Sequence, residues 1–204
     1  MNRRALLLAT LAATTLGPAA AFAALAPTPQ QSRGPFYPDR LPLYRDNDLV
    51  RVVGREGLAR GEITHLTGRV LDRSGRPLSG TLVEIWQCDA NGRYIHSGDV
   101  GGAPRDPGFQ GYGRFEIAAD GGYRFRTIRP LPYPGRAPHI HVAVRLPGQA
   151  PLVTQLYVKG APENDGDWLL QQAEDPDALI VPFRPIEAPD AALAAHFELV
   201  LATG

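Results

Sequence analysis

The chain has 204 residues with 21 basic and 21 acidic side chains, so its formal net charge is zero. This balance argues against a nucleic-acid-binding basic face and against an acidic solvating tail. The single cysteine, Cys88, excludes an intramolecular disulfide and a cysteine-based zinc cluster, and we expect it to be a small buried residue. The length allows one large all-β domain or two small ones, and 22 glycines with 20 prolines favour short elements joined by turns.

Residues 1–23 have the pattern of an export signal. Arg3-Arg4 precedes an uncharged stretch over residues 5–26, which contains the cleavage signal Ala21-Phe22-Ala23. A membrane anchor is the alternative, but the apolar core of residues 5–16 is short for a membrane span. The arginine pair resembles a twin-arginine signal with an incomplete consensus, and a plain secretory signal stays open. We expect a cleaved, periplasmic or secreted protein with no stable membrane anchor after processing.

Residues 24–60 show no sustained periodicity. Prolines at 27, 29, 35, 38 and 42 favour an extended N-terminal arm laid across the rest of the protein. From residue 61 the pattern changes to short apolar runs separated by turns, and it continues to residue 204. The sequence therefore predicts an arm over 24–60 and one β domain over 61–204.

Seven to nine strands are predicted in this domain. Tyr123, Phe125 and Thr127 alternate with arginines, which gives one buried and one solvated face. The only helical signal is a short one over 167–173. Many short strands with Gly/Pro turns predict an all-β, antiparallel β-sandwich of immunoglobulin or prealbumin type with long loops. The predicted strands are 63–71, 81–86, 114–117, 122–128, 139–146, 152–158 and 196–201.

The most informative segment is the run that ends in His139-Ile140-His141. Residues i and i+2 of a strand point to the same face, so the two histidines project together while Ile140 faces a core. This spacing suits two ligands of one metal ion, and a chance pair of histidines is the alternative.

The ligands near this pair narrow the choice of metal. No carboxylate or thiolate lies close by in the sequence, so the usual zinc sets and the two-histidine, one-carboxylate iron(II) set lack a third ligand. Tyr133 is near, and a tyrosinate oxygen added to two imidazoles suits a hard ferric ion. A copper or zinc protein that uses the histidine pair remains an alternative.

An ordered set of motifs between Gly34 and Val158 resembles the intradiol ring-cleavage dioxygenases, with a weaker continuation towards the C-terminus. The set is specific because many spaced motifs agree in order. The matching segments are Gly34–Tyr37, Leu66–Asp72, Gly75–Leu78, Val83–Gln87, Asp89–Tyr94, Gly122–Pro130, Pro132–Pro134, Arg136–His141 and Thr154–Tyr157.

The resemblance implies one non-haem Fe(III) ion per chain. Its implied ligands are Tyr94 and His139 in equatorial positions, and Tyr133 and His141 in axial positions. The resemblance also implies that Tyr133 is displaced when substrate binds, whereas Tyr94 stays bound.

Two further residues match catalytic positions of the family. Arg136 corresponds to an arginine over the substrate ring, and Gln155 to a glutamine behind the ligands. The implied reaction uses O2 to cleave a catechol-type aromatic diol between its two hydroxyls, giving a muconate-type diacid. A non-catalytic exported β-sandwich that binds sugars or aromatics is the alternative function.

The substrate pocket is less well defined by the sequence. Tyr37, His96 and Gly135 are the candidate pocket residues, although Tyr37 could instead anchor the arm and His96 could lie in a solvated loop. Trp86 and Tyr157 are expected in the core. The loop from Tyr133 to His139 is short for the family, and no helical dimerisation domain precedes the β domain. Substrate identity and oligomeric state therefore stay open.

Overall fold

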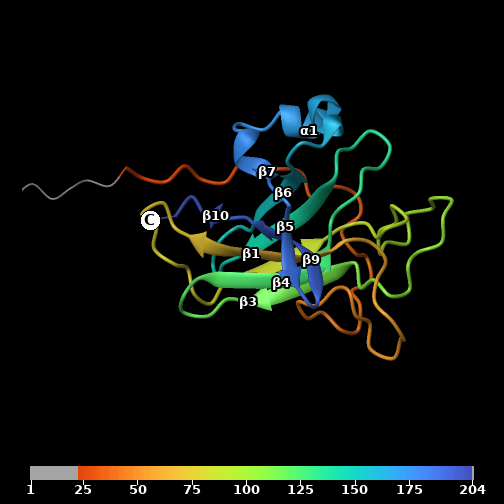
Figure 1. The fold of residues 1–204 in the computed structure, drawn as a ribbon. Coiled ribbons are helices and arrows are strands. Elements are labelled where there is room, and N and C mark those ends of the chain that lie inside the picture. Colours follow the sequence, from red (N-terminus) through yellow and green to blue (C-terminus); the bar gives the residue numbers. More distant parts are fainter. Residues whose placement is uncertain (1–22, 204) are drawn as a thin grey trace, which may run out of the picture.

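The computed structural model describes residues 23–203, so all but the last residue of the predicted export signal over 1–23 lies outside the described residues. Ten strands and one short α-helix make up the described part, together with two 3-10 helices at Pro162–Gly166 and Asp177–Leu179 (Figure 1). The strands are β1 (Ile63–Leu71), β2 (Leu82–Trp86), β3 (Tyr112–Glu116), β4 (Gly122–Ile128), β5 (His139–Arg145), β6 (Leu152–Val158), β7 (Ile180–Val181), β8 (Arg184–Ala188), β9 (Ala191–His196) and β10 (Leu199–Val200), and the helix is α1 (Trp168–Gln171).

The strands form two five-stranded sheets. One has the order β10-β1-β9-β8 with β4 also paired to β1, and the other has the order β3-β2-β5-β6-β7. The all-β sandwich predicted from the sequence is confirmed. The sheets are mixed rather than purely antiparallel, because β1 pairs in parallel with β9 and β10, and β6 pairs in parallel with β7.

The apolar core lies between the two sheets. Leu66 and Phe125 enter it from the first sheet, and Ile85, Ile140 and Leu156 enter it from the second. The strand alternation that predicted a buried face is therefore correct on both sheets. Burial of these side chains removes apolar surface from water, which is the main favourable term in folding.

The predicted strand over 196–201 differs from the structure. Its first part is the end of β9 and its last part is β10, separated at Phe197, whose N–H donates to the carbonyl of Thr67 at 2.9 Å. The sequence did not predict β7, β8 or the part of β9 before His196. An edge strand tolerates a proline, and β8 is an edge strand that contains Pro185, so its sequence lacks the alternation that marks a central strand.

Residues 23–62 contain no helix or strand and run along the sandwich towards the long loops at its end (Figure 1). Backbone hydrogen bonds tie this segment down: the N–H of Thr28 donates to Val200, and the N–H of Gln31 to Val153. None of the helices in residues 23–203 is long and apolar enough to cross a membrane.

Candidate active site

The candidate site lies on the outer face of the second sheet, opposite the apolar core. On β5, Ile140 packs into the core, as predicted, while His139 and His141 point to the other face. Cross-strand register places Trp86 and Gln155 beside His141, and Tyr157 beside His139. A row of polar and aromatic side chains thus crosses three neighbouring strands on one face of the sheet.

Four side chains converge at the end of this row. The Nε2 atoms of His139 and His141 are 3.2 Å apart. The hydroxyl oxygens of Tyr94 and Tyr133 lie 3.3 Å and 3.4 Å from Nε2 of His139. The structure therefore brings together all four residues that the sequence analysis assigned as metal ligands.

The turn before β5 determines which ring nitrogen of His139 faces the two tyrosine hydroxyls. Its Nδ1 lies 2.7 Å from the carbonyl oxygen of Ala137, so Nδ1 carries the proton and Nε2 presents a lone pair. The ring of His141 stacks on Trp86, with centroids 4.8 Å apart and planes 4° apart. Both imidazole rings are thereby held with Nε2 towards the two phenols.

The donor set fits a hard metal ion. Two ligand atoms that each lie about 2 Å from one ion are separated by about 3 Å when the angle between them at the ion is about 90–110°, and the three distances to Nε2 of His139 are close to that value. Within residues 23–203, no group of three or more histidine, cysteine, aspartate or glutamate side chains could hold a metal ion. The side-chain oxygens that lie nearest to Nε2 of His139 are those of Tyr94 and Tyr133.

Burial sets the protonation of these four groups. It raises the pKa of Tyr94 well above its ordinary value, and the neighbouring Tyr133 adds to that shift. It also raises the pKa of Tyr133, with Arg136 opposing the change. Burial and then Arg136 lower the pKa of His139 to about 4, and burial and then His139 lower the pKa of His141. Both imidazoles are thus neutral at pH 7, the form in which a histidine can bind a metal, and a bound cation would stabilise the phenolate forms of the two tyrosines.

Arg136 lies beside the four ligands and is largely buried. Its Nη1 is 3.4 Å from the hydroxyl of Tyr133, and its Nη2 donates to Oε1 of Gln155 at 2.6 Å and to the hydroxyl of Tyr157 at 3.1 Å. Its Nε donates to Asp167 at 2.9 Å. The structure therefore places both predicted catalytic residues, Arg136 and Gln155, in one hydrogen-bonded network with Tyr133.

The sequence analysis missed part of this network. Tyr157 was expected only in the core, yet its hydroxyl also donates to Gln31 of the arm at 2.9 Å. Trp86 is fully buried, as expected, but packs on His141 rather than in the central core. Asp167 was expected only to start a short helix. No sequence pattern links it to Arg136, which lies 31 residues earlier.

The arm covers the site from outside the sheet. Gly34 has a φ of +68°, and a Cβ at this position would meet Cε1 of His141 at 3.2 Å. Phe36 stacks on Tyr94 at a centroid distance of 5.2 Å. Tyr37 packs edge-on against Trp86, and its hydroxyl donates to the buried Glu84 at 3.2 Å. The side chain of Tyr37 therefore anchors the arm, and the ring of Trp86 lies between it and His141.

The other two candidate pocket residues lie at the edge of the site. His96 accepts a hydrogen bond from the N–H of Gly98. Its ring packs edge-on against the ring of Phe36, with the two centroids 5.8 Å apart. Gly135 is exposed at the turn between Tyr133 and Arg136, and a Cβ there would meet nothing within 4 Å. The surface around Gly135, between Tyr133 and Arg136 in the chain, therefore carries no bulky side chain within 4 Å of that position.

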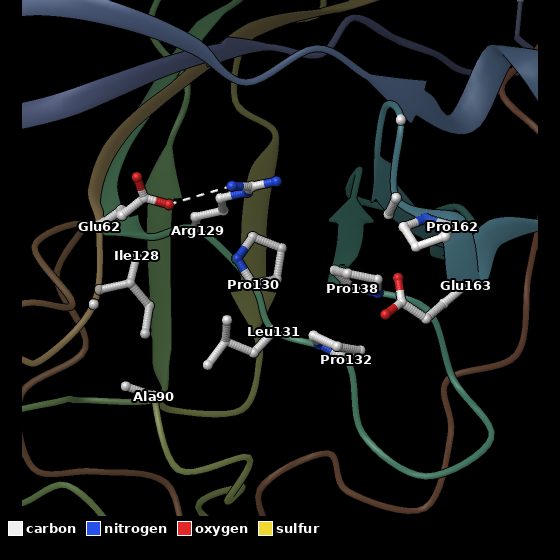
Figure 2. Close-up of a pocket in the computed structure, with 13 residues that line it drawn as sticks. Glu62, Ala90, Ile128, Arg129, Pro130, Leu131, Pro132, Pro138, Pro162 and Glu163 are labelled. Carbon is white, nitrogen blue, oxygen red and sulfur yellow. Dashed lines mark hydrogen bonds and ion pairs between the residues drawn. The ribbon is translucent and has the colours of Figure 1, made fainter.

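A separate pocket of about 380 Å³ is lined by the segment that leads from β4 to Tyr133 and by residues after β6 (Figure 2). Pro132 and Pro138, which precede Tyr133 and His139 in the sequence, form part of its wall, and an ion pair between Glu62 and Arg129 borders it. None of the four converging residues lines this pocket. Cys88 is buried nearby, as predicted, and its Sγ lies 3.7 Å from the carbonyl of Leu131.

Comparisons with known proteins identify the class to which this fold and site belong. A protein-family model described as Dioxygenase matches residues 32–203. The protocatechuate 3,4-dioxygenase beta chain of Burkholderia cepacia is 45% identical over 125 residues, covering 57% of this chain and 53% of that protein. The catechol 1,2-dioxygenase of Candida albicans is 28% identical over 186 residues, covering 82% of this chain and 58% of that protein.

A solved structure extends the comparison to three dimensions. The dioxygenase domain of a dioxygenase–carbohydrate-binding protein fusion from Streptomyces sp. SirexAA-E is 34% identical, with a TM-score of 0.66. The match covers 88% of this chain and 100% of that one. The chain belongs to the intradiol ring-cleavage dioxygenase family of oxidoreductases. It spans little more than half the length of the two curated relatives named above.

Proposed function

We propose that this protein is an Fe(III)-dependent dioxygenase that cleaves the ring of a catechol-type diol between its two hydroxyls, using O2. The observation that carries the proposal is the convergence of two phenol oxygens and Nε2 of His141 on Nε2 of His139, at 3.2–3.4 Å each. Tyr94, Tyr133, His139 and His141 would hold one non-haem ferric ion per chain. Such an ion supplies Lewis acidity that draws charge from a bound diolate and opens its ring to O2.

The two tyrosines would have different duties because their surroundings differ. Tyr94 is almost fully buried under Phe36, whereas Tyr133 is partly exposed to solvent. We assign to the Tyr133 oxygen the role of accepting a proton from an incoming diol. Tyr94 would remain in place and hold its charge out of contact with water.

Arg136 would orient the substrate and stabilise its charge. Its guanidinium is fixed by Gln155, Tyr157 and Asp167, and it lies beside Tyr133, where the diol would enter. A preorganised cation of this kind stabilises negative charge that develops on a ring without having to reorganise during the reaction. Gln155 would act by holding Nη2 of Arg136 with its Oε1. Its Nε2 donates to the carbonyl of Ser32 in the arm, and this bond fixes the amide with Oε1 towards Arg136.

The substrate class follows from the same site. A small aromatic diol could bind a metal ion through its two oxygens while its ring lies beside Arg136. Gly135 has no side chain, and the space around it would accommodate a substituent on the ring. The relatives are named for protocatechuate and for catechol. These names support the class and leave the ring substituent of this chain's substrate open.

The test is product analysis with purified, iron-loaded protein, catechol and O2. Cleavage between the hydroxyls gives a colourless muconate-type diacid, and both oxygen atoms of O2 enter the product. A coloured semialdehyde would show cleavage beside the hydroxyls and would refute the intradiol assignment. Arg136→Lys, which keeps the charge but loses the planar fork, is the matched variant and should lower turnover strongly.

We also propose that residues 1–23 direct export and are removed. The support is the sequence pattern of paired arginines, an apolar run and Ala21-Phe22-Ala23. Mass spectrometry of protein from the cell envelope should give a mature N-terminus at Ala24. Recovery of intact Met1 in the membrane fraction would favour an anchor instead.

A further inference from the structure

Asp167 is a buried carboxylate that joins two parts of the molecule at the site. Its side chain is 0% exposed. Oδ1 accepts the N–H groups of Leu169 and Leu170 at 3.1 Å each, which caps α1. Oδ2 accepts Nε of Arg136 at 2.9 Å and the N–H of Ala137 at 2.8 Å. Each oxygen therefore satisfies two donors, one pair from α1 and the other from the loop before β5.

The bond to Arg136 determines how the guanidinium is oriented. Because Nε is held by Asp167 and Nη2 by Gln155, the plane of the group is fixed at two points. The remaining nitrogen, Nη1, then faces the hydroxyl of Tyr133. Without Asp167, the guanidinium would be held only at its Nη2 end and could rotate away from Tyr133.

The bond to Ala137 extends the same control to a histidine. The N–H of Ala137 donates to Asp167, and its carbonyl oxygen accepts Nδ1 of His139. That second bond selects the tautomer with Nε2 free. One carboxylate thus holds the backbone that orients His139 and the side chain of Arg136.

We propose that Asp167 is a positioning residue of the active site, which acts through Arg136 and through the Ala137–His139 turn. The inference rests on the proposed function for its effect on turnover, but its structural part can be measured separately. Capping alone does not account for the contacts, because α1 is four residues long and uses only Oδ1. The whole of Oδ2 is directed at the site.

Two variants separate positioning from capping. Asn at 167 offers one acceptor oxygen, so its NH2 group must face one of the two donor pairs. Asp167→Ser keeps a helix-capping hydroxyl but has no second oxygen for Arg136 and Ala137. Asp72→Asn is the matched control. Asp72 is also a buried carboxylate that accepts backbone N–H groups and an arginine Nε, in the turn after β1 and outside the ligand network.

The first readout is hydrogen exchange at Nε of Arg136, followed by nitrogen-15 NMR on the full metal-free chain. Arg136→Lys assigns the signal by removing it. We expect slow exchange in wild type and in Asp72→Asn, and fast exchange in Asp167→Asn and Asp167→Ser. Slow exchange in both Asp167 variants would overturn the proposal, and the Ser variant decides the matter if the Asn variant does not fold.

The second readout is turnover of the iron-loaded enzyme. We expect Asp167→Asn to lower kcat by about 10- to 100-fold, with a smaller change in KM, and Asp72→Asn to leave kcat unchanged. In the Arg136→Lys background, Asp167→Asn should lower kcat by a clearly smaller factor than in wild type, because one of the two groups that Asp167 holds is gone and only the Ala137–His139 turn remains. An equal loss in both backgrounds, or an unchanged kcat, would overturn the proposal. If wild type cleaves no diol, the proposed function fails, and the exchange measurement alone decides whether Asp167 orients Arg136.

Discussion

The two faces of β5 are built to different requirements. Ile140, Val142 and Val144 enter the apolar core, whereas His139 and His141 enter the site on the opposite face. The core face needs volume and apolar surface, which several side chains can supply. The site face needs nitrogen and oxygen atoms at defined positions. The side chains that contact its two histidines come from the arm and from loops elsewhere in the chain. Neighbouring residues of one strand should therefore fail in different ways when they are changed.

The largest effect is expected at His141. Replacing it with alanine removes one of the four proposed ligands and leaves a buried gap beside Trp86. We expect metal affinity to fall by more than about 100-fold, the upper limit for loss of a supporting group around a metal, and ring cleavage to be lost. Metal analysis of the purified variant checks this. Full iron content with normal turnover would remove His141 from the ligand set.

The neighbouring core position should lose stability rather than chemistry. Ile140→Ala leaves a cavity in a fully buried position and should cost about 2–5 kcal/mol of the free energy of unfolding. Denaturant unfolding of the metal-free protein gives this value. The folded fraction should still bind one iron per chain. Loss of iron without loss of stability would contradict the division between the two faces.

A smaller effect is expected at Tyr133, the partly exposed member of the proposed ligand set. Tyr133→Phe should still bind iron but lose part of its colour. It should form the complex with catechol about 100-fold more slowly, because an internal proton acceptor is gone. Tyr94→Phe is the comparison and should slow complex formation less. Anaerobic stopped-flow mixing measures both rates, and an unchanged rate in Tyr133→Phe would refute its role as a proton acceptor.

The buried histidines on the site face of β5 should also make the free energy of unfolding depend on pH, which the apolar side chains on the core face cannot do. Burial lowers the pKa of His139 to about 4 and that of His141 well below its usual range. The unfolded chain therefore takes up protons below pH 6.5 that the folded chain refuses, so stability is lost as the pH falls. For His139 the loss at pH 5 is about 2 kcal/mol.

Urea unfolding of the metal-free protein at pH 7, 6 and 5 measures this loss. His139→Gln should flatten the dependence, whereas His196→Gln, a change at an exposed position on β9, should leave it as in wild type. Equal slopes in wild type and His139→Gln would contradict the account.

The sequence predicted the core face more completely than the network around the site. Strand alternation and turns are local signals, so β4 and β6 match their predicted bounds and Ile140 faces the core as expected. The spacing of His139 and His141 is also local. By contrast, the position of Tyr94 depends on the loop between β2 and β3, and its assignment needed the resemblance to a family.

The contacts that the arm and α1 make with the site could not be predicted from local sequence patterns. Gly34 lies against His141 and Asp167 holds Arg136, and each contact joins segments far apart in the chain. A single sequence carries no periodicity that pairs such residues. The same reason explains the missed edge strand β8, whose partner β9 alone makes it a strand.

The most direct test of the central claim is metal analysis combined with a visible absorption spectrum of the purified wild-type protein. If Tyr94 and Tyr133 bind Fe(III) with His139 and His141, the protein contains one iron per chain. It should also be red to burgundy, from charge transfer between tyrosinate and iron. A colourless protein with stoichiometric zinc, purified from iron-replete cells, would contradict the proposed ferric site.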